Sequence, residues 1–323
     1  MPAPELNIET LVEEVLSNGE AVLRPFVSEV EASPVPPLLY HYTDDAGLLG
    51  ILKSGKIWLS DVFHLNDPAE LRHGSAPAVE GLRWFAEEHR DRPELGTFAR
   101  DFEHFLGAGG LEASANYFVA CFSETDTELG QWRAYADDGK GYAIGFDGRA
   151  FENAFARKDG EPVQGNMTFP VTYDDAKLTS LQNHYVNDIL KYISLPRGRD
   201  LSGFDLNEYM KGISIAFSLN VLRTAAFFKH PAYKNEREYR YMQVQRGDRA
   251  PVGVQFRTRP YELIRYVEFD WRSIAPTALK EIVAGPAAGD SRGAQFASDC
   301  LRAHHPNHYV DVRRSAVPYR SLR

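Results

Sequence analysis

Short runs of apolar and aromatic residues, each followed by turn-forming residues, recur along most of the chain. Such runs are typical of β-strands, because branched and aromatic side chains pack well on a pleated surface. The pattern predicts strands at residues 38–42, 56–60, 117–123, 141–146, 168–173, 238–244, 252–256, 264–269, 279–284 and 309–312. Most consecutive strands lack a crossover helix between them, which argues against a doubly wound parallel sheet.

Helical spacing of apolar residues occupies several segments between these runs. The spacing predicts helices at residues 6–30, 46–54, 76–108, 129–135, 176–194, 206–228 and 290–304. Gly19 and Pro25 lie inside the first of these helices, and we expect them to divide it. Together the two kinds of element favour an α+β fold with a mixed sheet.

The helical pattern at about 174–230 interrupts an otherwise strand-rich part of the chain. A chain of 323 residues is long enough for two domains, but no repeat and no linker-like stretch divides it. We therefore expect an N-terminal helical segment at 1–37, one core at 38–285 that carries this helical insertion, and a C-terminal helix and strand at 286–323.

The composition is that of an ordinary globular protein, with 43% hydrophobic and 25% charged residues. Lys and Arg number 36 against 45 Asp and Glu, and the net charge of −9 argues against a protein that coats duplex nucleic acid. The two cysteines, Cys121 and Cys300, are far apart and support neither a disulfide framework nor a zinc site. The acidic N-terminal residues and the lack of a long apolar run predict a cytoplasmic protein without a membrane segment.

The segment Tyr40-His41-Tyr42-Thr43 gathers aromatic rings and hydrogen-bonding groups on one predicted strand. Flat rings and donors of this kind suit the recognition of a planar ring and a ribose. A single histidine on a strand is more often a packed, hydrogen-bonded residue. Both interpretations of His41 therefore stand at this point.

A second polar group begins at Ser123, where a predicted strand ends, and continues in the helical turns that carry Trp132 and Tyr135. These two aromatic residues are three positions apart and therefore share one face of a helix. They could line a ligand site or form a small aromatic core. No histidine or acid has the spacing that would identify Ser123 as a nucleophile.

The third group is the pair Glu236 and Glu238, which precedes Arg240 and follows Lys229. If the strand has begun by Glu236, both carboxylates and Arg240 point to the same face, because side chains alternate along a strand. Two neighbouring carboxylates raise the pKa of one of them unless a cation pairs with them. The pair is therefore either used chemically or part of a charge ladder on an edge strand.

In their order along the chain, these motifs resemble the uncharacterised bacterial family DUF2971. The motifs are Tyr-His-Tyr-Thr, Asn-Asp-Pro-x-Glu, Cys-Phe-Ser-Glu followed by Trp-x-x-Tyr-Ala-Asp, Gly-Lys-Gly-x-x-Ile-Gly-Phe, and Glu-x-Glu-Tyr-Arg. The resemblance covers about residues 38–285. It rests on the ordered combination, because each motif alone is weak.

DUF2971 is similar in turn to the ADP-ribosyltransferases, which implies a split, mixed and mostly antiparallel sheet with helical insertions and a three-part NAD site. Carried over by position, the similarity implies that Glu238 is the catalytic acid and that Glu236 completes a two-glutamate motif. It also implies that His41 contacts the adenosine-side ribose. The further residues implied to bind NAD are Tyr42, Thr43, Ser123, Trp132 and Tyr135.

The implied reaction breaks the bond between nicotinamide and ribose in NAD. Positive charge develops at the ribose, and a nearby carboxylate stabilises it. No metal is needed, because nicotinamide leaves as a neutral ring. The ADP-ribose would pass to water or to an unknown protein or nucleic acid acceptor, as in a bacterial toxin or phage-defence effector. We expect a rim of basic residues to guide the pyrophosphate, formed by Lys229, His230, Lys234, Arg237 and Arg240.

Two other functions remain open from the sequence. A non-catalytic module could use the same fold to hold a partner. A metal-dependent nuclease could use Asp67, Glu70, Glu236 and Glu238, whose oxygens are the ligands that Mg²⁺ prefers. These acids lack a recognisable metal-site spacing, which argues against the nuclease.

Overall fold

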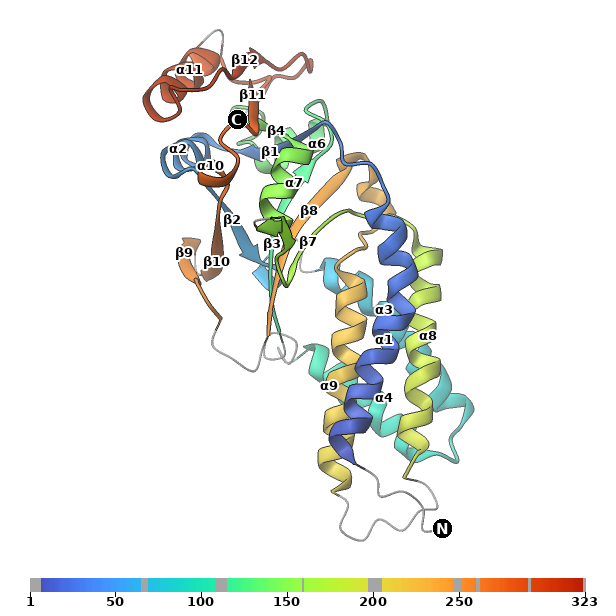
Figure 1. The fold of residues 1–323 in the computed structure, drawn as a ribbon. Coiled ribbons are helices and arrows are strands. Elements are labelled where there is room, and N and C mark those ends of the chain that lie inside the picture. The colour runs from blue at the N-terminus through green and yellow to red at the C-terminus, as the bar shows by residue number, and fades with distance from the viewer. Residues whose placement is uncertain are drawn as a thin grey trace.

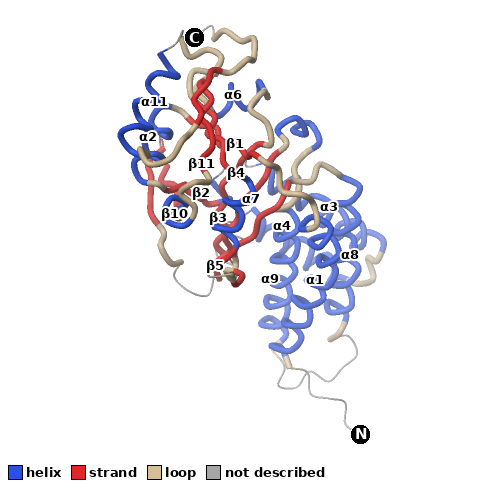
Figure 2. The backbone as a smooth tube through the Cα atoms, turned by 45° about the horizontal axis from the view of Figure 1, so that its top comes forward, coloured by secondary structure: helices blue, strands red, loops and turns tan. Residues whose placement is uncertain are grey.

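The computed structural model of the chain describes residues 7–64, 69–107, 115–158, 160–196, 205–246, 251–259, 262–289 and 292–321. A bundle of long helices lies beside an open sheet that carries shorter helices (Figure 1). Figure 2 shows that strands and long helices occupy separate regions. The sheet is mixed and its described pairings are mostly antiparallel, which confirms the predicted α+β class.

The long helices form the bundle through one apolar cluster. They are α1 (Ile8–Glu31), α3 (Ala69–Glu88), α4 (Pro93–Gly107), α8 (Asp175–Ser194) and α9 (Leu206–Ala225). The shorter helices are α2 (Asp45–Ser54), α6 (Leu129–Tyr135), α7 (Gly148–Ala156), α10 (Trp271–Ile274) and α11 (Arg292–His304), with 3₁₀ turns η1 (Val62–His64) and η2 (Pro231–Glu236). Among the described residues, no helix combines the length and the apolar character needed to cross a bilayer.

The main sheet surrounds a central strand, β3. Its strands are β1 (Leu38–Thr43), β2 (Lys56–Asp61), β3 (Ala115–Ser123), β4 (Tyr142–Asp147), β7 (Asn166–Pro170), β8 (Glu238–Arg246), β9 (Gln255–Arg259), β10 (Glu262–Asp270), β11 (Leu279–Ala284) and β12 (Asp311–Arg314). A separate hairpin consists of β5 (Arg157–Lys158) and β6 (Glu161–Pro162).

The sheet divides along one side of β3. Strand β8 pairs with the other side along its whole length, from Ala115 to Ser123. On the divided side, β1 pairs with β3 only at Ser123, whereas β2 pairs at Phe118 and Val119. The sheet therefore has a β1 wing (β1, β4, β11, β12) and a β2 wing (β2, β10, β9). The two wings separate along β3 between Val119 and Ser123.

Helix α2 connects the two wings, and local sequence signals set its ends. The Asp44 side chain caps its first turn by accepting a 2.7 Å hydrogen bond from the Gly47 amide. Gly55 ends the helix in a left-handed conformation, with φ 71°, that glycine adopts without steric cost. These signals are local, which is why the helix and the two flanking strands lie where the sequence predicts them.

The two faces of the sheet have different apolar covers. Helices α2, α7, α10 and α11 pack on one face around Phe122, Phe146 and Trp271. The bundle packs on the other face through Phe26 of α1, which contacts the ring of Phe228 after α9. The junction between bundle and sheet is therefore buried, and polar groups there need partners from the protein itself.

The prediction that Gly19 and Pro25 divide the first helix is wrong. Helix α1 is continuous from Ile8 to Glu31. Gly19 instead allows α9 to approach, and the Asn220 side chain donates a 2.9 Å hydrogen bond to the Val15 carbonyl at this point. Apolar residues on both sides of Pro25 are buried, and this packing outweighs the hydrogen bond that proline cannot make.

The single helix predicted at 76–108 is two helices, α3 and α4. Pro93 is the first residue of α4, where its missing amide hydrogen costs nothing, and it disfavours helical geometry at Arg92. Helix α7 and the β5–β6 hairpin were not predicted. The Asp147 side chain caps α7 by accepting from the Ala150 amide at 2.9 Å, a signal hidden at the end of a strand.

Gly19→Ala should lower the free energy of unfolding by about 1–3 kcal/mol, because a Cβ would overlap the Asn220 amide. Gly50→Ala on α2 is the matched control, since a Cβ there meets nothing within 4 Å, and it should raise stability by up to about 1 kcal/mol. Urea unfolding measures both. Equal stabilisation by the two substitutions would show that the contact between α1 and α9 is not tight.

Candidate functional site

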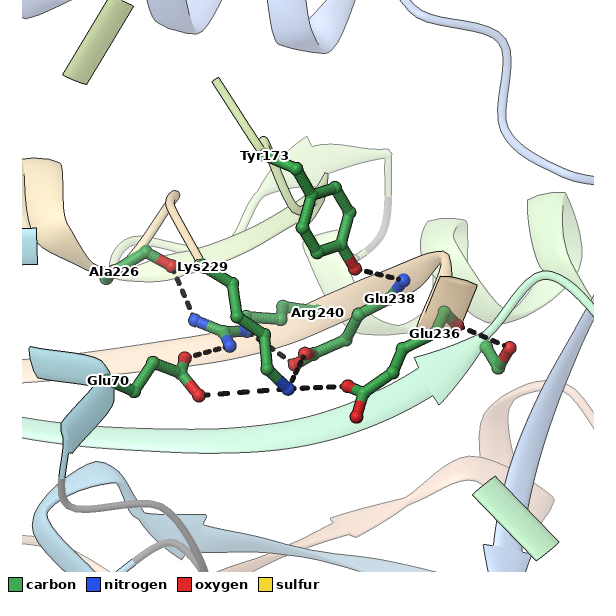
Figure 3. A network of polar contacts seen from close by, with 8 residues as sticks. Glu70, Tyr173, Ala226, Lys229, Glu236, Glu238 and Arg240 are labelled. Atoms are coloured by element: carbon green, nitrogen blue, oxygen red, sulfur yellow. Dashed lines mark hydrogen bonds and ion pairs between the residues drawn. The ribbon is translucent and has the colours of Figure 1, made fainter. Parts of the chain in front are cut away.

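Two buried cations and three carboxylates form one ionic cluster where the bundle meets the sheet (Figure 3). The Lys229 ammonium lies 2.6 Å from a Glu236 oxygen, 3.0 Å from Glu238 and 3.9 Å from Glu70. The Arg240 guanidinium pairs with Glu238 at 2.6 Å and with Glu70. The cluster therefore joins the start of α3, the segment after α9 and the start of β8.

A left-handed turn brings the two glutamates of the 236–238 segment together. The strand begins at Glu238, as the sequence predicts, and Glu236 lies before it, at the end of η2. Arg237 between them has φ 44° and ψ 54°, a conformation that a non-glycine residue adopts at a cost. The two carboxylates meet on Lys229 through this turn rather than through strand alternation. Glu238 and Arg240 do share a strand face, as predicted.

Hydrogen bonds from neighbouring segments fix this turn. The Ser123 hydroxyl donates to the Glu236 carbonyl at 2.7 Å, and the Glu124 amide donates to the Arg237 carbonyl at 3.0 Å. The Glu238 amide donates to the Tyr173 hydroxyl at 2.9 Å (Figure 3). Ser123 is buried, so its role in the structure is to hold the turn.

The cluster shifts the pKa values of its members in opposite directions. Burial alone would raise the pKa of Glu238, but the charges of Arg240 and Lys229 outweigh it and lower that pKa to about 2. Burial dominates at Glu236 and raises its pKa, although Lys229 opposes the effect. Burial would lower the pKa of Lys229, but Glu238 and Glu70 raise it. Glu238 and Lys229 therefore stay ionised at neutral pH.

Glu236 is the cluster carboxylate that reaches solvent most. Its side chain is 16% exposed, against 5% for Glu238 and 9% for Glu70. Both Glu238 oxygens are bonded to cations, whereas one Glu236 oxygen has no partner among the described residues. The exposed ring of Tyr233 lies 5.0 Å from the Lys229 ammonium. A ligand would therefore meet Glu236 first.

His41 lies at the division of the sheet. Its Nδ1 is 3.0 Å from the Cys121 carbonyl on β3, at a position where β1 makes no ladder bond to that strand. Its ring packs 5.3 Å from Phe122, and burial lowers its pKa, so the imidazole is neutral at pH 7. These contacts give His41 a structural role across the division. Its predicted contact with a ribose stays a prediction.

The aromatic residues expected to hold a ligand divide into a buried pair and an exposed one. Trp132 is fully buried, donates to the Asp126 carbonyl at 2.7 Å and packs edge-on against Tyr42. Tyr42 is also buried and donates to the Thr125 carbonyl at 2.8 Å, while the half-buried Thr43 ends β1. From these positions Trp132 and Tyr42 support the 124–128 loop, and their predicted contact with a ligand stays a prediction.

Tyr135 differs from that pair because part of its side chain is exposed. Its hydroxyl is the less accessible part, and this burial raises the pKa of Tyr135. The charges of Lys229 and Glu236 also act on that pKa, which places Tyr135 near the cluster. The sequence placed Trp132 and Tyr135 on one helix face, but the structure separates their environments.

The expected basic rim is only partly available. Lys229 and Arg240 are buried and paired with carboxylates, so neither can guide a pyrophosphate. His230, Lys234 and Arg237 remain exposed. Only these three residues are therefore available for the predicted rim, because the buried acids need the other two cations.

A surface hollow of about 670 Å³ borders the turn. Tyr40, Tyr239, Pro170 and Glu124 line it, together with residues 33–38. Because the Glu124 amide is bonded to the Arg237 carbonyl, the turn that carries Glu236 and Glu238 adjoins this hollow.

Sequence reasoning did not connect Glu70 with Arg240, which lie 170 positions apart, and it did not single out Tyr173. The grouping of Glu70 with Glu236 and Glu238 was considered only as a metal site. The ammonium of Lys229 lies among these three acids, and no described group of three or more His, Cys, Asp or Glu is placed to hold a metal. Asn66, Asp67 and Pro68 lie outside the described residues.

Residues 131–241 match a family model described as "Protein of unknown function (DUF2971)". The match confirms the predicted resemblance over this segment, which includes Lys229, Glu236, Glu238 and Arg240. No curated protein and no solved structure matches the chain. The similarity to ADP-ribosyltransferases stays a prediction.

Glu238→Gln should lower the free energy of unfolding by about 3–5 kcal/mol, because it leaves Arg240 and Lys229 buried with too little negative charge. Glu268→Gln is the control, since the pair of Glu268 with Lys56 is near the surface and contributes about 0–1 kcal/mol. Denaturant unfolding compares the two. Similar small losses in both would mean that the cluster does not hold bundle and sheet together.

Lowering the pH should lower the free energy of unfolding of the native protein through Glu238. A carboxyl whose pKa falls on folding stabilises the fold above its unfolded pKa, here 4.5, and loses that effect as pH falls toward about 2. The raised pKa of Glu236 acts in the opposite sense over its own range. The free energy of unfolding should therefore fall more steeply between pH 4.5 and 2 in the native protein than in Glu238→Gln. Parallel pH profiles would contradict the assigned ion pairs.

Proposed function

We propose that this chain cleaves the bond between nicotinamide and ribose in NAD and transfers ADP-ribose to an acceptor or to water. The observation that carries the proposal is a partly exposed carboxylate, Glu236, held rigidly by Lys229 beside the end of β3. The end of β3 lies there between the start of β8 and Tyr40 of β1. This arrangement supports the three-part site that the family resemblance implies.

The reaction needs a negative charge beside the ribose as the nicotinamide departs. We assign that role to Glu236, because one of its oxygens has no partner among the residues that the structure describes, while the Lys229 ammonium fixes the other at 2.6 Å. A preorganised charge of this kind needs no rearrangement as the transition state forms. Glu238, which the resemblance implied as the acid, positions Glu236 by holding Lys229 at 3.0 Å.

The surroundings of Glu236 suit the nicotinamide end of NAD. The nicotinamide ring of NAD is a flat cation, and such rings are attracted to aromatic faces and to carboxylates. Tyr135 and Tyr233 present exposed rings beside the cluster. His230, Lys234 and Arg237 supply exposed basic groups for the pyrophosphate. No metal enters this proposal.

A non-catalytic binding module is the second candidate. The near-complete pairing of charges in the cluster favours it. Arg240 and Glu238 are buried and neutralise one another, so neither charge is available to act on a ligand. The nuclease is less favoured, because Lys229 already neutralises the acids that a metal would need. For the enzyme we propose a bacterial, cytoplasmic setting as a toxin or phage-defence effector, with a protein or nucleic acid acceptor.

Glu236→Gln should reduce release of nicotinamide from NAD by about 10²–10³-fold, the usual effect of losing one preorganised group. Chromatography of free nicotinamide measures it, with label transfer from radioactive NAD as a second readout. Because Glu236 is at the edge of the cluster, the variant should unfold at nearly the native temperature, unlike Glu238→Gln.

Glu268→Gln serves as the control for removal of a carboxylate elsewhere on the sheet. No nicotinamide release by the native chain, combined with heat on titration with NAD, would favour the binding module. Full activity of folded Glu236→Gln would contradict the role of Glu236.

A further inference from the structure

The two faces of strand β2 differ: one packs into the core, and the other carries the exposed Trp58. Ile57 and Leu59 point from β2 into the core. Trp58 therefore points to the opposite face, because side chains alternate along a strand. The pairing of Ser60 with Tyr266 places Tyr266 on the same face as Trp58. Arg257 lies on this face too, since it pairs with Ile264, two positions from Tyr266.

Trp58, Tyr266 and Arg257 form a compact platform. The indole of Trp58 is 43% exposed, an unusual state for a tryptophan within a strand, and it lies 4.3 Å from the ring of Tyr266. The Arg257 guanidinium lies 5.9 Å from the indole and donates to the Ser60 hydroxyl at 3.0 Å. Tyr266 is buried and Arg257 is half-buried, so the strands hold one exposed indole beside a fixed cation. Figure 1 shows β9 and β10 on the side of the sheet away from the bundle.

The positive charge of Arg257 is not neutralised by a carboxylate among the described residues. Its Nε is buried without a partner, and burial, reinforced by Arg259, lowers its pKa.

The other described cations on this face each have a carboxylate partner. Lys56 binds Glu268 at 2.6 Å, and Arg259 lies 3.7 Å from Glu262. The platform therefore keeps a local positive charge within a protein of net charge −9.

We propose that this platform binds single-stranded nucleic acid, with a base on Trp58 and a phosphate at Arg257. An aromatic ring next to an arginine matches the two parts of a nucleotide, stacking and charge. A single-stranded nucleic acid fits better than a free nucleotide. An open sheet face cannot enclose a small ligand, so binding there gains affinity from contacts with several successive nucleotides. A duplex does not fit, because its bases are stacked inside.

Binding to this platform does not depend on the proposed NAD reaction, so the two proposals fail separately. Anisotropy of a fluorescein-labelled single-stranded oligonucleotide of mixed sequence tests it, with the full chain and without NAD. Trp58→Ala should weaken binding by about 5- to 100-fold, the usual effect of losing one stacked base. Trp58→Phe should restore most of the affinity. Arg257→Gln should weaken binding and reduce its salt dependence.

The chain offers matched controls. Trp84→Ala removes a 56% exposed tryptophan from α3, and Arg302→Gln removes an exposed arginine from α11, so both should leave binding unchanged. Thermal unfolding checks that each variant is folded. If Trp58→Ala does not fold, Trp58→Phe and Arg257→Gln still test the proposal.

Several outcomes would overturn the proposal. No binding by the native chain is one, and equal affinity for the duplex or for free nucleotide is another. Equal losses in Trp84→Ala and Trp58→Ala would show a non-specific effect. Unchanged oligonucleotide binding in Trp58→Ala, with loss of self-association in sedimentation, would identify the platform as a protein interface instead.

Discussion

The burial of Arg240 and Lys229 at the junction of bundle and sheet is the constraint on which the rest of the structure depends. Removing each cation from water costs several kcal/mol, and only well-placed carboxylates offset that cost. Glu70, Glu236 and Glu238 supply them from separate segments, and the Ala226 carbonyl accepts a further hydrogen bond from Arg240 at 2.8 Å. The bundle and the sheet can therefore adopt only the relative placement that brings these segments together.

This constraint also explains the strained turn at Arg237. A strand that continued through Glu236 would carry its carboxylate along the sheet rather than onto Lys229. The left-handed residue redirects the chain, and the Ser123 hydroxyl and the Glu124 amide hold the result. The free energy spent on an unfavourable backbone conformation is offset by completing the ionic cluster.

Features set by local sequence could be predicted, and features set by distant contacts could not. Strand alternation correctly placed Glu238 and Arg240 on one face, and the strands around α2 were found from local signals. Glu236 lies before the strand, so alternation does not place its side chain, and hydrogen bonds from other segments impose the turn that does. The ion pair of Glu70 with Arg240 spans 170 positions and has no local signal. The continuity of α1 through Pro25 likewise depends on burial against the bundle rather than on propensity.

In the proposed reaction, the carboxylate that stabilises the positive charge on the ribose must be both fixed and accessible, and these requirements conflict in a buried cluster. A fully paired acid such as Glu238 is fixed but covered, whereas a free surface acid is accessible but mobile. The chain separates the two tasks. Glu238 and Arg240 are buried and neutralise one another. Lys229 is fixed by Glu238, and it holds Glu236 in place at the edge of the cluster. Ser123, Trp132 and Tyr42 support the neighbouring turn and loop, and Glu236 is the most accessible carboxylate of the cluster, as the proposed reaction requires.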